Sequence, residues 1–184
     1  MGTRNLTMVI LDKETKVAQY GQWDGYPGGQ GATILTFLRE CNMKTFNKKI
    51  KELRWLTKKE IDAINPNPNW KELYPYLSRD VGGEILEVIY TKEIVGLMNQ
   101  EEFAKDSLFC EWAYVIDLDK KTLEVYCGFN QTPLKPKDRF YGNGEVNDGG
   151  YYPVRLLKSY SLTKLPTVKK FVSELEKLEE KVKA

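Results

Sequence analysis

The chain has 184 residues, a length that suits one hydrophobic core, so we expect a single domain over residues 1–184. Its 28 basic and 26 acidic residues leave a net charge of +2, which provides no general field for nucleic acid or an anionic membrane. No apolar run is long enough to span a membrane. We therefore expect a cytoplasmic protein whose partners include neither a membrane nor an extended nucleic acid.

Histidine is absent, and the three cysteines (Cys41, Cys110 and Cys127) lack the spacing of a metal site. We therefore expect no metal, no cofactor and free thiols in a reducing compartment. The absence of histidine also excludes the usual Ser and Cys triads, so catalysis would depend on carboxylates, Lys, Tyr or the chain terminus.

The N-terminal part alternates between strand and helix patterns. Residues 5–11 and 16–22 contain β-favouring residues on either side of a polar turn, which predicts a hairpin. From Ala32 to Cys41 the apolar residues follow helical spacing. The stretch AQYGQWDGYPGGQG, residues 18–31, therefore connects a strand to a helix.

The middle of the chain is mainly helical in pattern. Phe46, Ile50 and Leu53 mark one helical face, and Thr57 with Glu60 forms a capping box for a short helix. The turn-rich residues 65–69 end that helix. A further helix is expected over 84–90 and a short strand over 94–98.

The C-terminal part contains a second hairpin over residues 110–129, a loop over 130–150 and a strand over 154–162. The chain then ends in an amphipathic helix with Pro166 in its first turn and a continuous apolar stripe. This order predicts an α+β domain with a mainly antiparallel sheet built from hairpins and packed by several helices.

The glycine-rich stretch has the composition of a nucleotide pocket. Glycines at a helix N-terminus expose backbone N–H groups to an anion, aromatic rings stack on a base, and polar side chains bind its edges. Arg4 either supplies a cation at the same end of the hairpin or pairs with a surface carboxylate. The expected ligand-binding residues are Arg4, Gln19, Tyr20, Gln22, Trp23, Asp24, Tyr26, Gly28, Gly29, Gln30 and Gly31.

The same residues also fit a structural turn whose aromatic rings cap the core and whose polar groups bind one another. The glycine spacing matches neither a Walker loop nor the dinucleotide fingerprint. Both interpretations remain open from the residues alone.

An alternative is a hydrolase that uses Thr3, Asp24 or Glu111. A hairpin that begins near residue 3 is similar to the first strand of an N-terminal-nucleophile hydrolase, in which Thr3 would act after cleavage of the residues before it. Asp24 and Glu111 are the carboxylates best placed for a carboxylate-dependent reaction. No catalytic residue is expected in the leading interpretation.

The stretches GTRNLT, AQYGQWDGYPGGQG and CEWAYVIDLDKKTLEVY, taken together and in this order, resemble a family of small uncharacterised proteins from bacteriophages, bacteria and some fungi. The resemblance implies a phage accessory protein that counters a nucleotide signal of host defence, acting in the host cytoplasm. It implies no catalytic residue.

The leading hypothesis is thus a non-enzymatic protein that sequesters a nucleotide-like or other small anionic ligand. A protein–protein inhibitor that blocks a host factor with exposed aromatic residues is a further alternative. A homo-oligomer is compatible with the sequence, although no interface stripe is readable in it.

Overall fold

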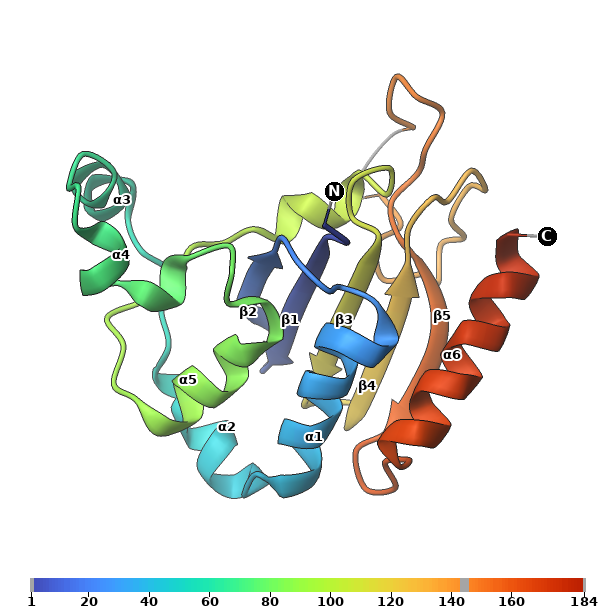
Figure 1. Cartoon of the computed structure of the whole chain (residues 1–184), viewed down its shortest axis with the longest axis horizontal. Helices are drawn as coiled ribbons and strands as arrows, with labels where there is room; N and C mark the ends of the chain where they lie inside the picture. Colours follow the sequence, from blue (N-terminus) through green and yellow to red (C-terminus); the bar gives the residue numbers. More distant parts are fainter. Residues whose placement is uncertain (1, 143–145, 184) are drawn as a thin grey trace.

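A five-stranded mixed sheet forms the centre of the protein (Figure 1). The computed structural model describes residues 2–142 and 146–183; part of the loop expected over 130–150 lies outside these residues. The strands lie in the spatial order β2-β1-β3-β4-β5. They are β1 (Asn5–Leu11), β2 (Glu14–Gly21), β3 (Trp112–Asp117), β4 (Thr122–Cys127) and β5 (Arg155–Ser161).

Six α-helices accompany the sheet within the described residues. They are α1 (Ala32–Glu40), α2 (Met43–Glu52), α3 (Lys58–Ile64), α4 (Trp70–Leu73), α5 (Ile85–Thr91) and α6 (Val168–Lys183). The capping box predicted for α3 is present, because the Thr57 side chain accepts from the Glu60 N–H and the Glu60 carboxylate binds the Thr57 N–H. The strand expected over 94–98 is wrong: Leu97 forms only an isolated bridge with Trp55.

Both predicted hairpins are confirmed, and a parallel pair joins them. β1 pairs antiparallel with β2, and β3 pairs antiparallel with β4, which in turn pairs antiparallel with β5. β1 and β3 run parallel, with Asn5 beside Trp112 and Ile10 beside Asp117. The segment between the hairpins, which contains α1 to α5, supplies the long connection that parallel strands require.

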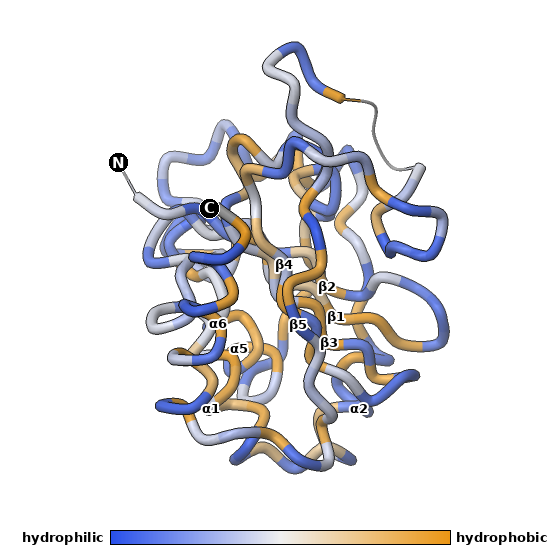
Figure 2. Tube along the Cα trace, turned by 90° about the vertical axis from the view of Figure 1, so that its right-hand side faces the viewer, coloured by the Kyte–Doolittle hydropathy of each residue, from blue (hydrophilic) through white to orange (hydrophobic). Residues whose placement is uncertain are grey.

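The two faces of the sheet are covered differently. Figure 2 shows α1, α5 and α6 on one side, which we call the helix face. Val9 and its neighbour Ile116 belong to the core on that face, whereas Met8 and Val115 belong to a second core on the opposite side. That opposite side, the loop face, is covered by a short helical turn, Glu101–Lys105, and by parts of the connection between β4 and β5.

The expected α+β class is therefore confirmed. The central strands are buried on both faces, and the C-terminal helix α6 packs through the fully buried Phe171 and Leu175. Among residues 2–142 and 146–183, no helix combines the length and the apolar character needed to cross a membrane.

Candidate functional site

The glycine-rich segment connects β2 to α1 and contacts the residues just before β1. Its last part, Pro27–Gly31, forms a single wide helical turn directly before α1. Asp24 has a left-handed backbone with φ of +53°, a conformation that Asp tolerates better than most residues. The Gly25 N–H donates to the Thr3 carbonyl oxygen at 2.8 Å. These features give the segment a defined path over the end of the sheet.

Two buried side chains hold the segment from below. The Asn5 amide, which is fully buried on β1, donates to the carbonyl oxygens of Gly21 at 3.3 Å and Trp23 at 3.4 Å. The Tyr114 hydroxyl on β3 donates to the Gly25 carbonyl oxygen at 2.8 Å. Because buried polar groups of this kind specify one geometry, the segment is organised before any ligand arrives.

The backbone N–H groups of the turn are used within the turn. Gly29 and Gly31 donate to the Tyr26 carbonyl oxygen at 3.0 and 3.4 Å, and Gln30 donates to the Asp24 carbonyl oxygen at 2.7 Å. The anion cradle expected from the sequence requires free donors at these positions. In this arrangement the three N–H groups serve the conformation of the turn.

A cleft of about 650 Å³ lies between the glycine-rich turn, α1 and the start of α5. Four carboxylates line it, those of Asp24, Glu40, Glu84 and Glu87, and none of its lining residues is Lys or Arg. Phe37 adds an aromatic side chain to the wall. The cleft is therefore negatively charged, and it favours cations and hydrogen-bond donors over anions.

Four of the residues expected to bind a ligand line this cleft: Asp24, Gly28, Gly29 and Gln30. Gln30 also connects two walls of the cleft, because its Oε1 atom accepts at 2.7 Å from the backbone N–H of Gly83, two residues before α5. Gly31 is buried and packs below the turn.

Trp23 and Tyr26 lie at the surface beside the turn, with 45% and 46% of their side chains exposed. The Trp23 indole donates to an Asp80 carboxylate oxygen at 2.8 Å, and the Tyr26 hydroxyl donates to Asp24 Oδ1 at 3.4 Å. Neither ring lines the cleft. Their exposure leaves both available to contact a larger molecule.

Gln19, Tyr20 and Gln22 support the end of β2. The buried Gln19 amide donates to the carbonyl oxygens of Tyr20 at 3.2 Å and Ser78 at 3.3 Å. The Tyr20 hydroxyl forms a short hydrogen bond with Gln22 Oε1. These three expected ligand-binding residues do not line the cleft, and their polar groups bind other parts of the protein.

Arg4 is paired with a carboxylate. Its Nε lies 3.5 Å from Glu111 Oε1, and its backbone N–H donates to the same oxygen at 3.2 Å. The guanidinium also lies over the Phe109 ring, 4.8 Å from the ring centre. The cation expected to bind an anionic ligand thus has a partner of its own and does not line the cleft.

Of the three alternative catalytic residues, Asp24 alone lines the cleft. Thr3 contacts the turn through its carbonyl oxygen, and Glu111 binds Arg4.

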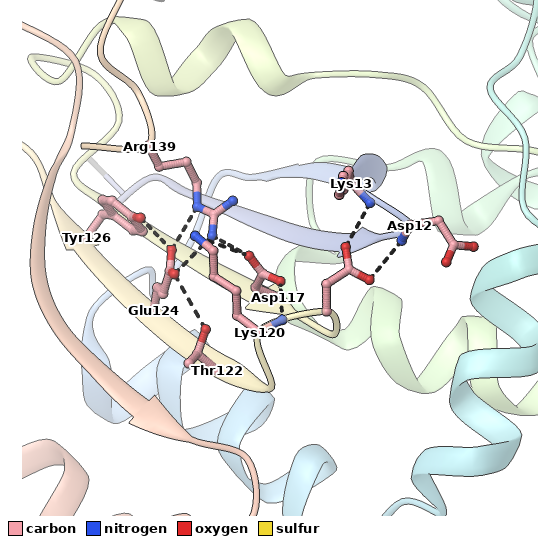
Figure 3. Close-up of polar contacts among 9 residues, drawn as sticks. Asp12, Lys13, Asp117, Lys120, Thr122, Glu124, Tyr126 and Arg139 are labelled. Atoms are coloured by element: carbon pink, nitrogen blue, oxygen red, sulfur yellow. Dashed lines mark hydrogen bonds and ion pairs between the residues drawn. The ribbon is translucent and has the colours of Figure 1, made fainter. Parts of the chain in front are cut away.

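A second polar centre, which the sequence did not predict, lies at the ends of β3 and β4 (Figure 3). Arg139, from the connection between β4 and β5, donates through Nε and Nη2 to the two carboxylate oxygens of Glu124 at 2.8 and 2.9 Å. Its Nη2 also donates to Asp117 Oδ2 at 2.6 Å. Asp117 and Glu124 are buried, so one guanidinium pairs with two carboxylates in the interior.

The environment of this centre keeps both carboxylates ionised. Burial raises the pKa of Asp117, but the Lys120 backbone N–H and the Arg139 guanidinium outweigh burial and hold the pKa below its usual value. Burial likewise raises the pKa of Glu124, and hydrogen bonds from Arg139 and Tyr126 lower it below its usual value. The pKa of Tyr126 is raised by its burial and by the adjacent Glu124 carboxylate.

A sequence signal for this centre exists in hindsight. Glu124 lies within the otherwise β-favouring strand TLEVYC, where a buried carboxylate requires a cationic partner. Nothing in the sequence pattern identifies Arg139 as that partner, because the two residues come from different segments.

Comparison of the chain with protein-family models, with curated proteins and with solved structures gave no match in any of the three.

Proposed function

We propose that this protein is a non-enzymatic binding protein that holds a small ligand in the cleft beside the glycine-rich turn. The observation that carries the proposal is the combination of a cavity of about 650 Å³ with four carboxylates in its lining. Small-ligand sites have volumes of roughly 300 to 1,000 Å³ and contain a few convergent polar groups. The buried anchors below the turn supply the rigidity that such a site needs.

The charge of the cleft indicates the chemistry of the ligand. Carboxylates accept hydrogen bonds from amines, from exocyclic amino groups of nucleobases and from ribose hydroxyls. The nucleoside part of the nucleotide-like ligand expected from the sequence therefore fits, and so does a small polyamine. A phosphate would meet Asp24, Glu40, Glu84 and Glu87 and would be repelled.

Capture rather than conversion of the ligand is proposed because, of Thr3, Asp24 and Glu111, only Asp24 lines the cleft. In the biological form of the proposal, a phage accessory protein withdraws from the host cytoplasm a nucleotide-related signal whose nucleoside part enters the cleft while its phosphates stay in solvent. This form rests on the resemblance of the glycine-rich stretch and the central hairpin to the phage-associated family.

The test is calorimetric titration of the protein with adenosine, guanosine, cytidine and spermidine. We expect at least one of them to bind, and the double substitution Glu84→Gln/Glu87→Gln to weaken that binding by about tenfold or more, because charged hydrogen bonds are lost. The matched control is Glu176→Gln/Glu180→Gln, which removes the same charge from exposed positions on α6.

Absence of binding by all four compounds would contradict the proposal. Equal weakening by the control pair would also contradict it, because the effect would then come from the overall charge of the protein.

A further inference from the structure

A second cavity, of about 440 Å³, lies where the turns of the two hairpins meet. It shares no lining residue with the cleft beside the glycine-rich turn. The Asp119 carboxylate fixes the two turns to each other, since it accepts from the backbone N–H groups of Asp12 at 3.0 Å and Lys13 at 2.8 Å. The same region is drawn in Figure 3.

Three cationic side chains from three segments line this cavity. Lys13 comes from the turn between β1 and β2, Lys120 from the turn between β3 and β4, and Arg139 from the connection that follows β4. Both lysines are exposed. The cavity thus brings together cations from three parts of the chain, beside the carboxylates of its lining.

Part of the Arg139 guanidinium is available to a ligand. Its Nε and Nη2 atoms bind Glu124 and Asp117, and among the described residues its Nη1 atom has no hydrogen-bond partner. Figure 3 shows the remaining nitrogen directed away from both carboxylates. The two carboxylates therefore fix the orientation of the guanidinium while one of its nitrogens stays free.

Two of the three acidic residues of the cavity are already satisfied. Asp117 accepts from the Lys120 backbone N–H at 2.9 Å and from Arg139, and the Lys120 ammonium lies 3.8 Å from its Oδ2 atom. Both oxygens of Asp119 accept from backbone N–H groups of the other turn. The third, Glu101, lines the cavity together with Thr15. The hydrogen-bonding groups that remain free are therefore mainly N–H donors of the cations. The Glu101 carboxylate and the Thr15 hydroxyl are left to bind polar groups on the rest of a ligand.

We propose that this cavity binds a small phosphate monoester whose body carries hydroxyl groups. The phosphate contacts Arg139, Lys13 and Lys120, and the hydroxyl groups bind Glu101 and Thr15. This site is separate from the cleft of the proposed function and, unlike that cleft, it contains cationic side chains.

The test is titration calorimetry at low salt with inorganic phosphate, ribose 5-phosphate and ribose. We expect ribose 5-phosphate to bind more tightly than inorganic phosphate, and ribose to show no binding that depends on the cavity. The variant Lys13→Asn/Lys120→Gln should weaken binding of ribose 5-phosphate by about tenfold or more. Asparagine is chosen because Lys13 has a φ of +64°, which asparagine tolerates.

The matched control is Lys44→Asn/Lys48→Gln, which removes two charges from exposed positions on α2. It should change the affinity by no more than about twofold, because screening weakens distant charges. A second control, Glu84→Gln/Glu87→Gln, should leave the affinity unchanged, which separates this site from the cleft.

Three results would overturn the inference. They are absence of ribose 5-phosphate binding, equal affinity for ribose and ribose 5-phosphate, and equal weakening by the two lysine variants. Circular dichroism of each variant shows that the fold is retained, so that a loss of binding reports on the cavity.

Discussion

Gly25 and Gly28 belong to the same turn but have opposite surroundings. A Cβ atom on Gly25 would lie 2.8 Å from the Thr3 carbonyl oxygen and 2.9 Å from the Arg4 carbonyl oxygen and Asn5 Cβ. A Cβ atom on Gly28 would find its nearest neighbours at 3.8 Å, an ordinary contact. Gly25 thus allows close packing within the turn, whereas the sequence had predicted that glycines of this segment, Gly28 among them, bind an anion.

We therefore expect Gly25→Ala to lower the free energy of unfolding by about 2 kcal/mol, because the added methyl group meets backbone atoms that cannot move aside. Gly28→Ala should change it by less than about 1 kcal/mol. Urea denaturation followed by tryptophan fluorescence measures both. Similar losses for the two variants would show that the packing around Gly25 is not the cause.

The connection between β4 and β5 is the element that the sequence describes least well. Its described residues form no regular strand, yet it supplies Phe140 and Val154 to the core on the loop face. The ion pairs of Arg139 with Asp117 and Glu124 attach it to β3 and β4. This connection, which the sequence predicted to be a loop from its prolines and glycines, thus covers part of one face of the sheet.

Substitution of Arg139 should weaken the attachment of this connection to β3 and β4, and the resulting loss of stability should depend on pH. We expect Arg139→Gln to lower the free energy of unfolding at pH 7 by about 3 kcal/mol, since two buried carboxylates lose their cation. The control Arg54→Gln breaks an exposed pair with Glu60 and should lower the free energy of unfolding much less, because solvent screens that pair.

The pH dependence follows from the lowered pKa values of Asp117 and Glu124. In the unfolded chain these carboxyls titrate near pH 4, so the stabilisation is complete above about pH 5 and is lost as the pH falls through the lower pKa values of the folded state. Arg139→Gln should therefore flatten the decline of stability between about pH 5 and pH 3. An unchanged acid profile in urea denaturation at several pH values would contradict this assignment.

At the scale of the whole molecule, the sheet has a core on each of its faces, and the thiols lie in or beside these two cores. Cys110 and Cys127 are buried and Cys41 is half-buried. Burial raises the pKa of the Cys41 thiol to about 11 and also raises the pKa values of Cys110 and Cys127. The sequence predicted free thiols, and burial gives the physical reason for their low reactivity.

We expect the native protein to react slowly with a disulfide reagent at pH 8, because little thiolate forms and access is restricted. Addition of denaturing urea should make all three thiols react rapidly. Absorbance of the released thiol chromophore measures both rates. Rapid reaction of two thiols in the native protein would contradict the buried positions of Cys110 and Cys127.

The sequence by itself determined the local elements. Runs of β-favouring residues on either side of a turn identified both hairpins. The Thr57 and Glu60 pair identified the start of α3, and the apolar stripe identified α6. All of these signals arise from residues that are neighbours in the sequence. The tertiary structure decided the parallel pairing of β1 with β3, the acidic lining of the cleft and the partner of each buried charge. Those features join residues far apart in the chain. A local sequence pattern therefore cannot predict that Arg139 will bind Glu124, or that Glu84 will line the same cleft as Asp24.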